Sequence, residues 1–157
     1  MRALKLVQHM KNNANQMAEA VVQKTRSSEK CIELLLRVSV EEQKQCSLEI
    51  YRDLTDWLAT EPDSKIEERY VALGTRRARQ GVPLSNLYWA VCIANEHLSE
   101  YMQQECLLEE PVEFWGGVML LRSLNRFFDR ISYFTIVGYQ KAGKEDLAGA
   151  PAAFAQR

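Results

Sequence analysis

The chain has 157 residues, of which 46% are hydrophobic and 26% charged, and its formal net charge is −1. These values are typical of one water-soluble globular domain with its own core, and they exclude a strongly basic nucleic-acid-binding protein. No apolar run approaches the roughly 18 residues of a membrane-spanning helix, and the amino terminus has no signal-peptide core. We therefore expect a cytoplasmic protein with neither nucleic acid nor membrane as a partner.

The cysteines fit neither a disulfide framework nor a metal module. They are Cys31, Cys46, Cys92 and Cys106, with no C-x-x-C pair among them, and all lie in helical patterns. Such thiols are expected to be reduced and packed, and their spacing to the two histidines of the chain matches no zinc site. We expect no metal and no cofactor.

Every periodic segment of the chain has the spacing of a helix, and no alternating strand pattern occurs. The predicted helices cover residues 2–26, 31–38, 39–59, 64–81, 83–105 and 112–141. Two of them begin with the spacing of a capping box, Ser39 with Glu42 and Ser64 with Glu67. The predicted fold class is all-α, a bundle of five to six helices with a long C-terminal helix.

The composition changes after the last predicted helix. Residues 142–157 are rich in Ala, Gly and Pro, which is typical of a linker or a fraying end. We therefore expect a helical sensory or input domain over residues 1–141, followed by a linker or tail over residues 142–157.

The last two long helices carry more apolar surface than one core contact needs. Apolar residues occur on a second side of each, which is typical of a helix that meets another subunit or domain. The predicted interface residues are Trp89 and Ile93 of the first helix, and Tyr133, Ile136 and Tyr139 of the second.

Arg77 is the most unexpected charge in the sequence. At helical spacing it continues the apolar side formed by Ile66, Tyr70 and Leu73, so its guanidinium is expected to face the core. A buried guanidinium needs acceptors or an anion. It either pairs with a protein group and fixes the helix register, or it anchors a small anionic ligand.

Asn95 interrupts an apolar helix side in the same way, and Tyr88 lies two turns before it. The structural interpretation is that Asn95 satisfies its hydrogen bonds within the core. The functional alternative is a ligand pocket held by Arg77 and lined by Tyr88 and Asn95.

His97 admits three interpretations. It can be a packed core residue, a haem ligand in an apolar pocket, or a phosphoacceptor beside Glu96 and Glu100. The residues around it lack the motifs of histidine kinases and phosphotransfer bundles. We favour the structural interpretation and keep His97 as a candidate ligand-binding residue.

No segment has the signature of a catalytic site. The chain lacks a P-loop, a dinucleotide fingerprint, a nucleophile elbow and an H-E-x-x-H motif. The acidic pairs stand at helix starts, where the helix dipole favours them. We expect no enzymatic activity.

Residues 70–84, YVALGTRRARQGVPL, resemble the N-terminal domain of RsbRD-type RsbT co-antagonists, a domain that also precedes sensor histidine kinases. The shared features are a glycine, the Arg77-Ala78 pair, and Gly81-Val82-Pro83-Leu84 opening a long helix. A long terminal helix with Phe127-Phe128-Asp129 and a late aromatic residue adds to the likeness.

The resemblance implies a bacterial signalling input domain without enzymatic activity. It also implies a globin-like helical fold without haem, a homodimer, and a terminal helix that leads to an output domain such as a STAS domain or a kinase. This chain contains neither output domain.

Two functions are consistent with these features. The first is a non-enzymatic input domain, acting in stress response, that senses a ligand or partner and relays it through helix packing at a dimer interface. The alternative is a globin-like sensor that holds haem or another small ligand in a core pocket.

Overall fold

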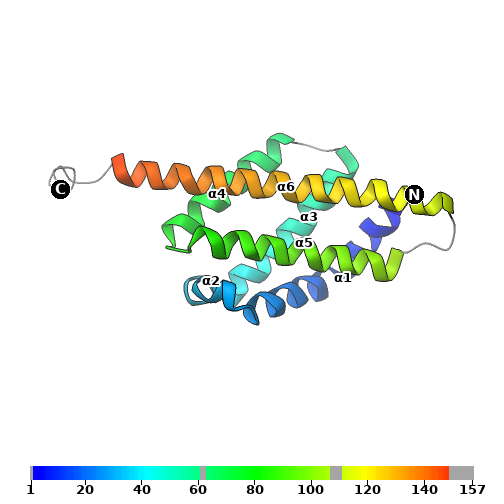
Figure 1. The fold of residues 1–157 in the computed structure, drawn as a ribbon, viewed down its shortest axis with the longest axis horizontal. Coiled ribbons are helices and arrows are strands. Elements are labelled where there is room, and N and C mark those ends of the chain that lie inside the picture. Colours follow the sequence, from blue (N-terminus) through cyan, green and yellow to red (C-terminus); the bar gives the residue numbers. More distant parts are fainter. Residues whose placement is uncertain (1, 61–62, 107–110, 149–157) are drawn as a thin grey trace.

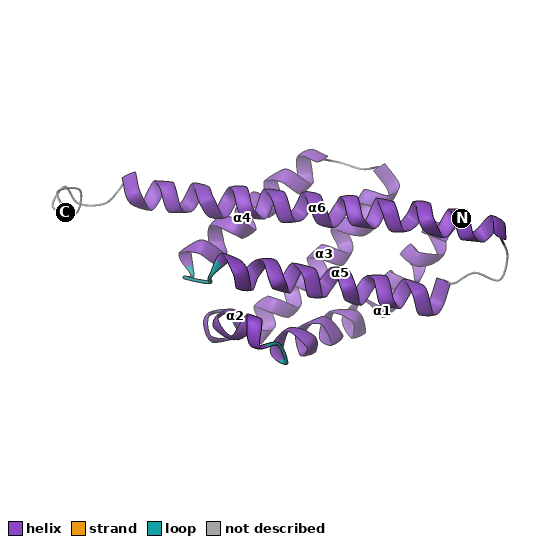
Figure 2. Ribbon diagram, in the orientation of Figure 1, coloured by secondary structure: helices purple, strands orange, loops and turns teal. Residues whose placement is uncertain are grey.

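The structure is a computed structural model, and it describes residues 2–60, 63–106 and 111–148. In chain order the elements are α1 (Arg2–Arg26), η1 (Glu29–Cys31), α2 (Ile32–Arg37), α3 (Val40–Thr60), α4 (Asp63–Arg79), α5 (Leu84–Cys106) and α6 (Pro111–Ala148). Within the described ranges no strand occurs (Figures 1 and 2). The predicted all-α bundle with a long C-terminal helix is confirmed.

Helix α1 has the predicted extent but is kinked at Asn13, where φ and ψ are −121° and 15°. The Asn13 side-chain amide donates to the carbonyl of His9 at 3.0 Å, a local bond of the kind that bends helices. Met10 and Met17, on either side of the kink, are both buried. The two halves of α1 therefore contribute to one core.

The start of α3 follows the predicted capping pattern in part. The Ser39 hydroxyl accepts a hydrogen bond from the Glu42 backbone N–H at 3.1 Å, as expected of an N-cap serine. The Glu42 carboxylate, however, reaches across to Arg77. This acidic side chain is used for a tertiary contact between α3 and α4.

Helix α4 begins at Asp63, so Ser64 lies inside its first turn and is not the N-cap that the sequence predicted. Asp63 suits the positive end of the helix dipole and also lies 3.1 Å from the Arg130 guanidinium of α6. Pro62, which follows the predicted helix over residues 39–59 and is of a type that ordinarily breaks a helix, lies outside the described residues.

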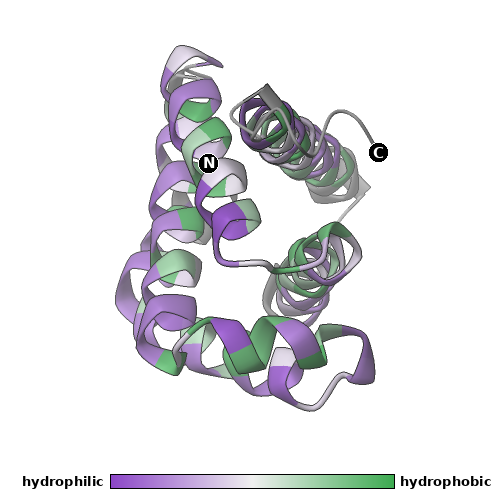
Figure 3. Ribbon diagram, turned by 90° about the vertical axis from the view of Figure 1, so that its left-hand side faces the viewer, coloured by the Kyte–Doolittle hydropathy of each residue, from purple (hydrophilic) through white to green (hydrophobic). Residues whose placement is uncertain are grey.

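The most extensive helix packing joins α4 to α6, and the next most extensive joins α1 to α3. Helix α5 lies between α1 and α6, and Figure 3, viewed nearly along α5 and α6, shows them side by side. In Figure 1 the C-terminal part of α6 projects beyond the other helices.

The buried apolar residues form two clusters. The larger one lies between α1, α3, α4, α5 and α6 and includes Trp57 and Phe127, whose ring centroids are 6.1 Å apart. The smaller one lies under the α4–α5 turn, and its buried members are Cys31, Leu34, Val38, Val82, Leu87 and Ile93. The turn within residues 70–84 thus packs on this second, smaller cluster.

Helix α6 extends to Ala148, beyond the Lys141 end expected from the sequence. Ala142 is 1% exposed and Arg79 of α4 lies 3.4 Å from Glu145, so tertiary contacts accompany the extension. The division of the chain at residues 141 and 142 stays a prediction. None of the helices in the described ranges combines the length and apolar character needed to cross a bilayer.

Candidate functional site

The turn between α4 and α5 has the hydrogen bonds of a Schellman motif. The Val82 N–H donates to the Arg77 carbonyl at 3.1 Å, and the Gly81 N–H donates to the Ala78 carbonyl at 3.0 Å. Gly81 has φ of 75°, a conformation that side-chain-bearing residues rarely adopt. The glycine of the sequence motif is therefore required by the turn itself.

Helices α4 and α6 approach so closely that no side chain fits between them at two points. A Cβ atom at Gly74 would overlap the Thr135 carbonyl, and one at Gly138 would overlap the Val71 carbonyl. The Thr75 hydroxyl lies 3.1 Å from the carbonyl of Gly138. The backbones thus lock together directly at this crossing.

The α4–α5 turn itself is also hydrogen-bonded to α6. The Tyr139 hydroxyl donates to the carbonyl of Val82 at 2.7 Å, and Val82 is fully buried. Further along α6, Glu145 lies 3.4 Å from the Arg79 guanidinium. The motif therefore holds the terminal helix to the bundle.

Arg77 faces the interior, where it is 2% exposed. Its Nη1 lies 2.5 Å from Glu42 Oε1 and 2.8 Å from Gln80 Oε1. Burial of Glu42 raises its pKa, but the hydrogen bond and charge of Arg77 outweigh this, and the pKa lies below its usual range. The charge of Arg77 is thus matched by a carboxylate of α3.

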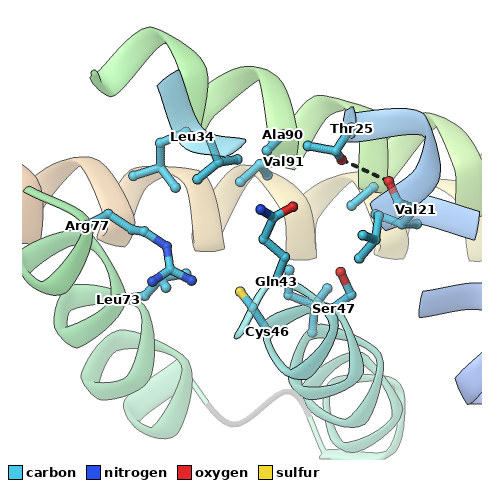
Figure 4. A pocket seen from close by; sticks show the side chains of 14 residues that line it. Val21, Thr25, Leu34, Gln43, Cys46, Ser47, Leu73, Arg77, Ala90 and Val91 are labelled. Atoms are coloured by element: carbon cyan, nitrogen blue, oxygen red, sulfur yellow. Dashed lines mark hydrogen bonds between the residues drawn. The ribbon is translucent and has the colours of Figure 1, made fainter. Parts of the chain in front are cut away.

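Arg77 also forms part of the wall of a partly enclosed cavity of about 60 Å³. The lining residues come from α1 to α5 and are Val21, Val22, Thr25, Leu34, Gln43, Cys46, Ser47, Ile50, Leu73, Arg77, Leu87, Ala90, Val91 and Ala94. Figure 4 shows the Gln43 amide reaching from α3 toward α5, between Arg77 and Val21. Its Oε1 atom is buried and has no hydrogen-bond partner among the described residues.

Of the four predicted ligand-binding residues, this cavity includes only Arg77. Tyr88 is 49% exposed, and Asn95 has a buried Oδ1 without a partner in the described part of the chain, but neither lines the cavity. His97 instead borders a shallow groove with His9 and Tyr101. Burial and, next, the charge of Lys24 lower the pKa of His97.

The predicted interface residues differ in exposure. Tyr133 is 63% exposed, whereas Ile93 is 9% exposed within the second core cluster. Ile136 is half-buried, and so is Trp89, whose ring has the Lys30 ammonium 3.9 Å from its centroid. Tyr139 is half-buried and bonds to Val82, as described above.

Among the described residues, five buried polar side chains were not anticipated from the sequence. Thr25, Ser47 and Thr135 carry only a hydroxyl group, and the other two carry an amide or a carboxylate. Gln43 is one, and the other is Asp53, which is 5% exposed, pairs with Arg69 and accepts a hydrogen bond from Tyr70 at 2.9 Å. Burial raises the pKa of Asp53, although Tyr70 and Arg69 oppose the shift. The sequence feature that indicates the burial of Asp53 is its position on the apolar side of α3, three residues after Ile50.

The described residues contain no group of three or more His, Cys, Asp or Glu side chains that could hold a metal ion. The cavity lining contains no histidine. At about 60 Å³ it is also far smaller than the roughly 300–1,000 Å³ of pockets that take larger ligands. A haem would need a different site in the molecule.

The described part of the chain is an all-α bundle with a cavity lined by five helices and a terminal helix that is hydrogen-bonded to the α4–α5 turn. The chain belongs to the family of the RsbT co-antagonist protein RsbRD N-terminal domain, whose family model matches residues 15–150. This confirms the resemblance drawn from the motif over residues 70–84. The family is one of signalling domains and is not a known enzyme family.

No curated protein and no solved structure matches the chain significantly. The globin-like character of the bundle therefore stays a prediction, while its all-α class is established.

Proposed function

We propose that this domain is a non-enzymatic cytoplasmic input domain that senses a ligand or partner and relays the signal through α6 to an output domain. The output is a STAS domain, a kinase or a similar module, and the setting is a bacterial stress response. The observation that carries the proposal is the chain of contacts from the cavity wall to α6.

This chain of contacts has three steps. Arg77 lines the cavity with its side chain and accepts from the Val82 N–H with its carbonyl. Val82 in turn accepts the Tyr139 hydroxyl of α6 at 2.7 Å. A ligand that changes the packing of the helices around this cavity, α4 among them, therefore acts on the turn that holds the terminal helix, because packed elements transmit strain.

The relay is completed by a second copy of the domain. Met119, Tyr133 and Leu147 of α6 are 62%, 63% and 78% exposed. They are spaced by fourteen residues, two heptads, so they fall along one side of the helix. The heptad positions between them hold Arg126 and Gln140, so the three apolar side chains are separate contact points, and we propose that α6 pairs with α6 through them in a homodimer.

Sedimentation velocity over a range of protein concentrations tests the dimer. We expect a dimer that Tyr133→Arg weakens by at least about tenfold, because the substitution places a charge in an apolar contact. Leu36→Arg makes the same kind of change on exposed α2, where Leu36 is 74% exposed, and should leave the dimer intact. A concentration-independent monomer would show that the dimer relay is wrong.

Native mass spectrometry of gently purified protein, against a denatured control, tests ligand sensing. Extra mass that is released on denaturation supports a ligand sensor. A dimer without retained mass, even after incubation with a cell extract of small molecules, indicates a domain that transmits contacts from a protein partner.

We propose further that the domain works without haem. Incubation with haem is expected to give no Soret band that depends on His97. A Soret band that appears in the parent protein and is lost in His97→Ala would restore the haem alternative.

A further inference from the structure

The cavity is lined by a buried hydrogen-bond acceptor, Gln43 Oε1, that has no partner among the described residues. Gln43 is 7% exposed, and its Nε2 atom donates to the Val38 carbonyl at 2.9 Å. This bond fixes which end of the amide is which, because the reversed amide would place two acceptors face to face. The Oε1 atom, which has no partner among the described residues, is thereby directed away from Val38.

The other polar groups of the wall narrow the kind of occupant. The Thr25 hydroxyl donates to the Val21 carbonyl at 2.8 Å, so its oxygen has only lone pairs left to offer. The charge of Arg77 is already matched by Glu42. Ser47 and Cys46 also line the cavity, and their hydroxyl and thiol groups are neutral. An anion would therefore find no unmatched cation among the lining residues, whereas a neutral molecule with an O–H or N–H group would satisfy Gln43 Oε1.

The volume of the cavity and its apolar lining residues limit the kind of occupant further. Nine of the fourteen lining residues have aliphatic side chains. A buried water usually needs two to four polar partners, and Gln43, Thr25 and Ser47 all line this cavity, so water is the alternative occupant that the experiment below has to distinguish. A cavity of about 150 Å³ holds benzene, so about 60 Å³ suits a molecule of only a few non-hydrogen atoms.

We infer that the cavity is a binding site for a small neutral molecule with one O–H or N–H donor and an apolar remainder, of the class of short-chain alcohols. The donor bonds to Gln43 Oε1, and the apolar part packs against the aliphatic walls from α1 and α5. The inference names a ligand class for the sensing function proposed above and rests on that proposal for its biological role.

Two small molecules with the same arrangement of non-hydrogen atoms test the inference. 2-Propanol and acetone each have four non-hydrogen atoms, but only 2-propanol donates a hydrogen bond. In titrations of the ¹⁵N-labelled protein below about 100 mM probe, we expect saturable shifts at the amides of the cavity residues. The affinity for 2-propanol should exceed that for acetone by about five- to tenfold.

Variants separate specific binding from solvent effects. Gln43→Leu should abolish the preference for 2-propanol over acetone. Gln45→Leu makes the same change two residues away, on the exposed side of α3, and should preserve it. Ala90→Leu, which fills the cavity, should remove the saturable shifts for both probes while the folded spectrum is retained.

Equal affinities for the two probes in the parent protein, or a preference that persists in Gln43→Leu, would overturn the inference. So would the absence of saturable shifts, which would leave water as the occupant. None of these results depends on dimer formation or on an output domain, so failure here is distinguishable from failure of the proposed relay.

Discussion

The hydroxyl of Tyr139, on the terminal helix, donates to the carbonyl of Val82, in the turn between α4 and α5, at 2.7 Å. Val82 is fully buried and belongs to the second core cluster. One hydrogen bond thus joins the C-terminal part of α6 to the segment on which the sequence resemblance to the family was drawn.

Tyr139→Phe removes this bond and leaves the Val82 carbonyl without its donor. We expect the free energy of unfolding to fall by about 1–2 kcal/mol. Amide hydrogen exchange in the last turns of α6 should also become faster, because the helix loses a fastening point. Urea denaturation and exchange mass spectrometry measure the two effects.

Tyr133→Phe is the matched control, since Tyr133 is 63% exposed on the same helix. Its unfolding free energy should stay within about 0.5 kcal/mol of the parent. Equal losses in the two variants would mean that the Tyr139 hydroxyl has no special role.

Gly138→Ala should disturb the crossing of α4 and α6, because the new methyl group overlaps the Val71 backbone. Relief requires the two helices to move apart, and we expect a loss of at least about 2 kcal/mol in unfolding free energy. Gly143→Ala, on the same helix but with no atom within 4 Å of the added Cβ, should instead gain about 0.5–1 kcal/mol. A stabilising Gly138→Ala would contradict the close approach.

The Glu42–Arg77 pair predicts a loss of stability in acid. The pKa of Glu42 is lowered in the folded protein, so its contribution is present above the unfolded-state pKa of about 4.3 and is lost as pH falls through the folded-state value. Glu42→Gln should flatten this part of the stability-against-pH curve. The exposed neighbour variant Glu41→Gln is the control, and curves of the same shape for both variants would reject the assignment.

Asp53→Ala should lower the free energy of unfolding because it removes the carboxylate that two other side chains contact. Tyr70, 3% exposed, loses the acceptor of its hydroxyl, and Arg69 loses its ion pair. We expect a loss of about 2–4 kcal/mol in unfolding free energy by urea denaturation. Asp129→Ala, at an exposed position of α6, should change it by less than about 0.5 kcal/mol. A similar small change for Asp53→Ala would show that the buried cluster contributes little.

The features that could be predicted from the sequence are those set by nearby residues. The Ser39 cap and the Gly81 turn depend on contacts within five residues. The inward direction of Arg77 follows from helical periodicity, and its burial agrees with that expectation. Helix class and most helix ranges were predictable for the same reason.

The cavity could not be predicted because it depends on how distant helices meet. Arg77 and Gln43 line it together only because α3 packs near α4, and no local pattern specifies the distance between them. Asn95 lies one turn beyond Val91 on α5, and it does not line the cavity, whereas Val91 does. Gln43 lies seven residues before Ile50, on the same side of α3, so helical spacing indicated its burial as it did that of Asp53, but not the missing partner of its Oε1 atom.

The backbone contact at Gly138 has a mechanical consequence. At this crossing the backbones of α4 and α6 meet directly, which resists sliding of one helix along the other, so a tilt of α6 would pivot here with unequal arms. Met119 lies about 28 Å from the pivot and Lys144 about 9 Å, at 1.5 Å per residue. If α6 tilts on signalling, labels at Met119 would travel about three times as far as labels at Lys144, and in the opposite direction.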